Sequence, residues 1–230
     1  ILDPSCQRDE TGDLRIQNGK VAEIGRDLPS NENEEVIDAS GMLVVPGFVD
    51  MHVHLREPGP EDKETNATAT RAAGACGYTS ICPMPNTTPV CDSAQGLHFL
   101  RSQATNTALA NIFPVAAVTR EQKGESLTEI GDLVYYGAVA FSDDGNSIKS
   151  AEIMRRALEY TSMFDAPILS HCEDKDLSKE GQMRSGAVAM KLGLKGIPYV
   201  AFSSHVARDL DLAQYTRGRV HIQHVSDRQS

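Results

Sequence analysis

Hydrophobic and polar positions change their period along this chain, and the change divides it into two parts. Residues 13–25 alternate polar and apolar side chains around Asn18-Gly19, which is typical of two antiparallel strands joined by a tight turn. A polar stretch at 29–35 follows. We therefore predict a small N-terminal β module at residues 1–42 and a larger domain at 43–230.

From residue 43 onward, short apolar runs alternate with segments that read as helices. Several of these segments open on Ser and end near Gly, as helix caps do. The glycine-containing stretch after residue 176 is expected to be a loop with at most a short helix. The predicted strands are 43–49, 78–82, 112–118, 139–142, 167–170 and 220–225, and the predicted helices are 64–76, 93–105, 126–136, 150–163 and 203–215.

This alternation predicts an α/β fold with parallel strands and right-handed crossovers. A TIM (β/α)₈ barrel is favoured, because polar residues recur directly after the strands, where barrel active sites lie. A doubly wound open sheet is the alternative, although the chain has no G-x-G-x-x-G sequence and no phosphate-binding loop. Only six strands are predicted, whereas a barrel needs about eight. The barrel is therefore expected to be incomplete.

Composition and charge restrict the classes of partner. With 40% hydrophobic and 23% charged residues, the chain resembles ordinary globular proteins. The net charge of −10 argues against nucleic acid or an anionic membrane surface as a partner. No apolar run approaches the ~20 residues that span a bilayer. Five cysteines without a C-x-x-C pair indicate free thiols in a reducing compartment, so a cytoplasmic protein is expected.

Two histidines two residues apart, His52 and His54, follow the apolar run at 42–49. On the end of a strand they would lie on one face, and imidazoles at that spacing suit a divalent ion such as zinc. Arg56 continues the spacing and offers a planar fork for a carboxylate. This pattern alone is weak evidence, since strand histidines are often structural.

Further candidate residues follow four other predicted strands. Singly, each has a simpler explanation: His171 could be a core histidine, and Asp143-Asp144-Gly145 could be a turn. Four imidazoles and a carboxylate exceed the three protein ligands that one catalytic zinc usually has, and they fit two metals sharing a carboxylate. The polar residues after these four strands are Asn86, Asp144, His171 and His224.

The other histidines, and Cys172, are expected to serve the fold. Cys172 neighbours His171 on a strand and should point to the opposite face as a buried thiol. His221 lies three residues before His224 and is expected to face the helices. His98 and His205 fall in predicted helices and are expected to be structural or surface residues.

Residues 46–59 (PGFVDMHVHLREPG) resemble the opening signature of dihydroorotases in the amidohydrolase superfamily. Residues 83–87 (PMPNT), 141–145 (FSDDG), 170–174 (SHCED) and 224–226 (HVS) match later motifs of that family in order. The resemblance implies a TIM barrel with a composite β module, built from the N-terminal segment together with a C-terminal one.

The resemblance also implies a metal site with one or two Zn²⁺ ions per subunit, bridged by an aspartate. The FSDDG sequence is similar to a bacterial branch in which aspartate replaces a carboxylated lysine. The implied metal ligands are His52, His54, Asp144, His171 and His224. The implied substrate-binding residues are His54, Arg56 and Asn86.

The implied activity is that of a zinc-dependent cyclic amidohydrolase. A dihydroorotase reversibly cyclises N-carbamoyl-L-aspartate to (S)-dihydroorotate in de novo pyrimidine biosynthesis, by means of a metal-bound hydroxide. The family's acid/base aspartate follows the eighth barrel strand, so we expect it beyond Ser230 and expect these 230 residues alone to have little activity. A homodimer is expected, with aspartate transcarbamoylase as a candidate partner.

Three alternatives remain open. An allantoinase or dihydropyrimidinase shares the His-x-His-x-Arg opening but is expected to have lysine at position 144. A non-catalytic subunit that supports aspartate transcarbamoylase would not need intact metal ligands. A metal-dependent deaminase rests on superfamily analogy alone. One departure from the family is Phe202, where relatives commonly carry an acidic residue, and it is expected to alter the local packing of its helix.

Overall fold

The computed structural model describes residues 1–230 and divides them into two compact units, Ile1–Phe48 and Val49–Ser230. In the first unit, β3 (Asp13–Gln17) pairs antiparallel with β4 (Lys20–Gly25). Asn18 and Gly19 have φ angles of 51° and 72°, as a two-residue turn between twisted strands requires. The predicted hairpin is confirmed, whereas the predicted boundary after residue 42 and the composite module stay predictions. The unit also contains β1 (Leu2–Asp3), η1 (Pro4–Cys6) and β2 (Arg8–Asp9).

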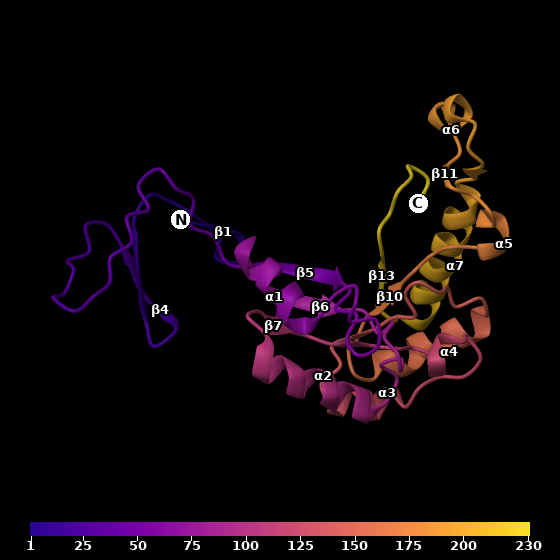
Figure 1. Ribbon diagram of the computed structural model, residues 1–230, viewed down its shortest axis with the longest axis horizontal. Helices are drawn as coiled ribbons and strands as arrows, with labels where there is room; N and C mark the ends of the chain where they lie inside the picture. The colour runs from indigo at the N-terminus through magenta and orange to yellow at the C-terminus, as the bar shows by residue number, and fades with distance from the viewer. The chain divides into compact units, whose positions relative to one another are not determined.

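The second unit alternates strands and helices along the chain (Figure 1). Its main strands are β5 (Phe48–Val53), β6 (Tyr78–Pro83), β7 (Asn111–Ile112), β8 (Val115–Ala116), β9 (Ala140–Phe141), β10 (Ile168–Ser170) and β13 (Val220–Ile222). Its main helices are α1 (Asn66–Ala75), α2 (Ala94–Thr107), α3 (Ile130–Tyr135), α4 (Ala151–Ser162) and α7 (Val200–Thr216). Shorter elements are η2 (Arg120–Gln122), α5 (Lys175–Ser178), β11 (Met183–Arg184), α6 (Ala187–Leu192) and β12 (Gly196–Ile197).

The main strands follow one another in chain order. One sheet has the order β5-β6-β7, and a second has β8-β9-β10-β13 when read along the chain. The pairs β6–β7, β8–β9, β9–β10 and β10–β13 are parallel. The helices pack in the same order, α1 on α2, α2 on α3, α3 on α4 and α4 on α7. Parallel strands covered by consecutive helices form an arc, in which the carboxyl ends of the strands share one edge.

The main core lies between the second sheet and the helices α3 and α4. On α4, Met154, Ala157, Leu158 and Thr161 are buried, the spacing of a helix with one apolar face. The helix begins after Ser150, whose hydroxyl accepts a hydrogen bond from the Ile153 N–H at 3.3 Å. Burying a large apolar side chain contributes about 1.5–3 kcal/mol. The second sheet, whose strand ends carry candidate residues, is therefore packed against a buried core.

Several predicted strand boundaries are wrong. The strand predicted at 43–49 begins only at Phe48, because Pro46 has no N–H for a sheet ladder, and Leu43 is 68% exposed. The strand predicted at 112–118 is two strands, β7 and β8, interrupted by Phe113-Pro114. The strand predicted at 220–225 ends at Ile222.

Two helix starts also differ from the prediction. The helix expected at 126 begins at Ile130, because Leu127 forms an antiparallel bridge with Thr119 instead. The helix expected at 203 begins at Val200. The segment after residue 176 is more regular than predicted, since β11 and β12 pair in parallel around α6.

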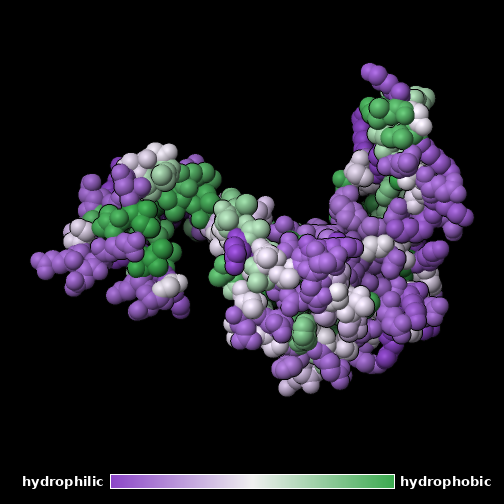
Figure 2. Space-filling model, viewed as in Figure 1, coloured by the Kyte–Doolittle hydropathy of each residue, from purple (hydrophilic) through white to green (hydrophobic).

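The segment β11–α6–β12 carries exposed apolar side chains. Figure 2 shows hydrophobic surface at the position of α6, where Val188, Met190 and Leu192 are exposed. Phe202, the departure noted in the sequence, has a specific partner: the guanidinium of Arg184 lies 3.7 Å from the centre of its ring. No helix of the chain is long and apolar enough to cross a membrane.

Candidate metal centre

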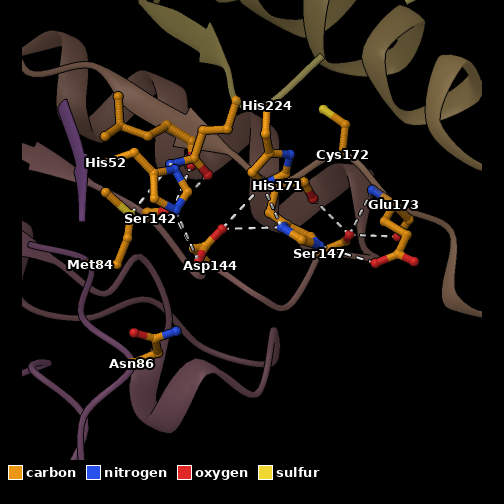
Figure 3. Close-up of polar contacts among 12 residues, drawn as sticks. His52, Met84, Asn86, Ser142, Asp144, Ser147, His171, Cys172, Glu173 and His224 are labelled. Carbon is orange, nitrogen blue, oxygen red and sulfur yellow. Dashed lines mark hydrogen bonds and ion pairs between the residues drawn. The ribbon is translucent and has the colours of Figure 1, made fainter. Parts of the chain in front are cut away.

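The predicted metal ligands converge at the carboxyl ends of four strands (Figure 3). His52 lies on β5, and His54 follows that strand directly. Asp144 follows β9, His171 follows β10, and His224 comes two residues after β13. The strands β9, β10 and β13 are neighbours in one sheet, and β5 is the first strand of the other, so residues far apart in sequence reach one place.

The two carboxylate oxygens of Asp144 face different pairs of imidazoles. Oδ2 lies 3.5 Å from His52 Nε2 and 3.7 Å from His54 Nε2. Oδ1 lies 3.1 Å from His171 Nδ1 and 3.3 Å from His224 Nε2. The last two rings also meet, with Nδ1 of His171 2.9 Å from Nε2 of His224. This arrangement is compatible with two cations that share one carboxylate.

The backbone of Asp144 is fixed on both sides. Its N–H donates to Ser142 Oγ at 3.1 Å, and its carbonyl oxygen accepts from Gln122 Nε2 at 2.9 Å. The Ser142 hydroxyl in turn donates to the Leu169 carbonyl oxygen at 2.7 Å, which joins the ends of β9 and β10. The buried carboxylate is therefore preorganised by its neighbours.

The adjacent carboxylate, Asp143, has a different role. It accepts hydrogen bonds from the Val118 N–H at 2.9 Å, from the Thr119 N–H at 3.0 Å and from the Thr119 hydroxyl. Burial raises the pKa of Asp143, and these hydrogen bonds oppose that rise. Asp143 thus ties the end of β9 to the segment after β8, while Asp144 faces the imidazoles.

Three of the four imidazoles have their other ring nitrogen held by a side chain. Such outer partners orient a metal-binding ring, and an oxygen acceptor also fixes the ring proton on its own side. From the sequence, Asn86 is expected only to bind substrate, and Glu173 and Gln223 have no expected role. The pairs are His52 Nδ1 with Gln223 Nε2 at 3.0 Å, His54 Nδ1 with Asn86 Oδ1 at 3.0 Å, and His171 Nε2 with Glu173 Oε2 at 3.1 Å.

The protonation states of the site suit cation binding. Burial by itself would raise the pKa of Asp144, but hydrogen bonds with His171, His224 and His52 hold it well below its ordinary value. Burial lowers the pKa of His54, and the Arg56 charge lowers it further. Burial also opposes ionisation of Glu173, yet bonds from Lys175, Ser178 and His171 lower its pKa to about 2. Metal ligands must be charged carboxylates and neutral imidazoles, as Asp144 and His54 are here at neutral pH.

Arg56 lies beside the imidazoles without a polar partner. Its guanidinium makes no hydrogen bond or ion pair in the structure, although it is partly buried, and its charge acts on His54. Asn86 uses only its carbonyl oxygen, on His54, so its amide N–H groups remain free. A free guanidinium and a free amide are suitable donors for an anionic ligand.

The residues expected to be structural lie outside the centre, with one correction. Cys172 is buried, its sulfur points away from Asp144 (Figure 3), and burial raises the pKa of its thiol to about 12. His98 is exposed on α2, and His205 is half-buried in α7. The prediction that His221 packs against helices is wrong: it is exposed, on the last strand of its sheet.

The donor set fits a divalent metal. One ligand atom each from His52, Asp144 and His224 lies within 4.8 Å of the others. Imidazole nitrogens bind zinc at about 2.0–2.1 Å and carboxylate oxygens at about 2.0–2.2 Å. These three residues are of the types and spacing that can hold a metal ion.

The sequence of the chain is similar to those of known proteins. Dihydroorotases of Syntrophotalea carbinolica and Pelotomaculum thermopropionicum are 49% and 50% identical to the chain, over 99% and 98% of its length. The matches cover 53% and 52% of those proteins, so the chain spans about half the length of the curated relatives it matches.

Solved structures share the fold at lower identity. L-hydantoinase (dihydropyrimidinase) of Arthrobacter aurescens has a TM-score of 0.77 at 22% identity, over 94% of this chain and 49% of that one. D-hydantoinase (dihydropyrimidinase) of Thermus sp. has a TM-score of 0.74 at 23% identity, over 95% of this chain and 49% of that one. The predicted fold class, an incomplete (β/α) barrel, is confirmed.

The family match covers the residues that build the centre. The family described as "Dihydro-orotase-like" matches residues 41–230, a range that includes all four imidazoles, Asp144 and Arg56. Together with the relatives near 50% identity, this bears out the resemblance found in the motifs. The chain belongs to the dihydro-orotase-like family.

Proposed function

We propose that the protein is a dihydroorotase, which reversibly cyclises N-carbamoyl-L-aspartate to (S)-dihydroorotate in de novo pyrimidine biosynthesis. The observation that carries the proposal is Asp144 between two imidazole pairs, with the unpaired guanidinium of Arg56 beside them. Family membership and the name shared by the relatives support the same reaction.

The proposed cofactor is Zn²⁺, with His52 and His54 on one side of Asp144 and His171 and His224 on the other. Four imidazole nitrogens and a carboxylate are the ligand types that zinc prefers. When bound, zinc lowers the pKa of a coordinated water towards neutrality and polarises an amide carbonyl. Asp144 is proposed as the bridging ligand because each of its oxygens already faces one pair.

Arg56, Asn86 and His54 are proposed to bind the substrate. A guanidinium can take both oxygens of the substrate carboxylate, and Asn86 can donate its free N–H to the same group. Asn86 would then connect the substrate carboxylate to His54, whose Nδ1 it holds at 3.0 Å. Binding the carboxylate in this way orients the ring amide of the substrate and reduces its freedom before reaction.

The acid/base step is not assigned to a carboxylate near the imidazoles, because each of them is engaged. Asp144 faces four ring nitrogens, and Asp143 accepts from the backbone of Val118 and Thr119. Glu173 pairs with His171 and Lys175. A general acid or base needs a free oxygen within hydrogen-bond reach of the substrate.

Substrate assays test the proposal. With the protein that carries these residues, we expect turnover of dihydroorotate, which has a carboxylate for Arg56, and little turnover of dihydrouracil, which has none. Arg56→Met should raise KM for dihydroorotate, whereas Arg120→Met, an exposed arginine paired with Glu129, should not. Turnover of dihydrouracil or allantoin without turnover of dihydroorotate would contradict the proposal.

Assembly and location extend the proposal. We propose a cytoplasmic homodimer, with aspartate transcarbamoylase as a candidate partner. The exposed apolar side chains of α6, Val188, Met190 and Leu192, support a protein partner, since apolar groups gathered on a surface often mark an interface. Light scattering after size-exclusion chromatography, with and without the transcarbamoylase, tests both associations.

A further inference from the structure

The outer partners of the imidazoles differ in charge. His52 is held by the neutral amide of Gln223, and His54 by the neutral amide of Asn86. His171 is held by the carboxylate of Glu173, 3.1 Å from its Nε2. No polar partner holds the Nδ1 of His224, whose recorded contacts all use Nε2. The side of the centre formed by His171 and His224 therefore depends on a single charged outer partner.

Glu173 is itself fixed by its surroundings. Its Oε2 lies 2.6 Å from Lys175 Nζ, and its side chain is only 15% exposed. Its N–H donates to Ser147 Oγ at 2.9 Å, and the same hydroxyl lies 2.7 Å from the carbonyl oxygen of His171. Ser147 thus fixes the backbone of this turn, while Lys175 fixes the carboxylate against the ring (Figure 3 shows Ser147, Glu173 and His171).

A carboxylate on one ring nitrogen changes what the other nitrogen can do. It accepts the proton of Nε2–H, so the ring keeps that tautomer and Nδ1 carries the free lone pair. It also makes Nδ1 a stronger base, which strengthens its bond to a cation. In this structure Nδ1 of His171 points at Asp144 Oδ1, 3.1 Å away, where the proposed metal binds.

We propose that Glu173 is a positioning residue of the metal centre, which fixes His171 with Nδ1 towards Asp144 and raises the metal affinity of the His171/His224 side. The inference rests on the proposed metal centre and adds a residue to it. Loss of an outer partner of this kind typically weakens metal binding by about 10- to 100-fold.

The chain offers a matched control for this carboxylate–lysine pair. Glu180 pairs with Lys195 at 2.7 Å, is exposed, and contacts no imidazole. Zinc affinity is measured by chelator competition on the 230-residue chain and on three variants. We expect a 10- to 100-fold loss in Glu173→Ala, a smaller loss in Glu173→Gln, which keeps an acceptor oxygen, and no change in Glu180→Gln.

Ring-nitrogen NMR distinguishes positioning from a merely structural role. In zinc-loaded wild-type protein, His171 should carry its proton on Nε2, and this signature should be lost in Glu173→Ala while the metal-free melting temperature stays near that of wild type. If Glu173→Ala does not fold, the zinc affinity of Glu173→Gln and its ring-nitrogen NMR signals test the positioning role in its place.

Wild-type affinity in the Glu173 variants, or an equal loss in Glu180→Gln, would overturn the positioning role alone. Absence of zinc binding by the wild-type chain would instead overturn the proposed metal centre, and the positioning role with it.

Discussion

Asp143→Ala and Asp144→Asn change adjacent carboxylates, and we expect them to have different consequences. Asp143→Ala leaves the N–H groups of Val118 and Thr119 buried without an acceptor. Each unsatisfied donor costs about 1–3 kcal/mol, and relief from burying the Asp143 charge offsets part of that cost. We expect a net loss of about 2–4 kcal/mol, which lowers the melting temperature of the metal-free chain by roughly 5–15 °C.

Asp144→Asn removes a charge but leaves no backbone donor without a partner. The metal-free melting temperature should therefore fall less than in Asp143→Ala. Zinc affinity should fall at least 100-fold, since Asp144 faces all four imidazoles directly. Zinc at 1,000 times the wild-type Kd stabilises wild type by about 4 kcal/mol, and a variant that binds 100-fold more weakly by only about 1.4 kcal/mol.

Differential scanning calorimetry with and without zinc measures both effects. The expected pattern is a low metal-free melting temperature with a normal zinc-induced rise for Asp143→Ala, and a small zinc-induced rise for Asp144→Asn. A full zinc-induced rise in Asp144→Asn would refute the assignment of Asp144 as the bridging ligand. If only Asp143→Ala abolished the zinc-induced rise in melting temperature, Asp143 and not Asp144 would be the bridging ligand.

Three further predictions concern single residues. In the active protein that carries these residues, Arg56→Met should raise KM for dihydroorotate at least tenfold without changing zinc affinity, measured by steady-state kinetics and chelator competition. Equal losses of both would contradict a substrate role. Gly59→Ala should destabilise the chain in urea unfolding, because the residue has a φ of 116° and an added Cβ would lie 2.6 Å from Thr88 Cβ, and wild-type stability would show that the loop shifts freely. Cys172→Ser should leave zinc affinity unchanged in the same competition assay, since its sulfur points away from Asp144, and a clear loss would make it a ligand.

Much of the fold could be predicted from local patterns. The hairpin around Asn18-Gly19 and the helix starts near Ser93 and Ser150 depend on residues adjacent in sequence, and the structure has all three. Strand ends at prolines were less predictable. The run before Pro46 is as apolar as a strand, yet the strand begins after it, because Pro46 has no N–H to donate to a ladder.

The metal ligands could be predicted because each follows a strand, and neighbouring parallel strands bring their ends together. Their outer partners could not. Gln223 directly precedes His224, and Glu173 lies two residues after His171, but their roles depend on the direction of an imidazole ring, which no periodicity encodes. Gln223 also contacts His52, a residue 171 positions away. The position of Asn86 in the loop after a strand made it a candidate from the sequence. Its contact with His54 could not be predicted, because the two residues are 32 positions apart.

We propose that Asp144 holds two metal ions between two histidine pairs. Anomalous X-ray diffraction at the zinc edge, on crystals of the chain grown with zinc, tests it most directly. We predict two anomalous peaks on either side of the Asp144 carboxylate, one beside His52 and His54 and one beside His171 and His224. A single peak that Asp144 does not contact, or no peak among these imidazoles, would contradict the claim.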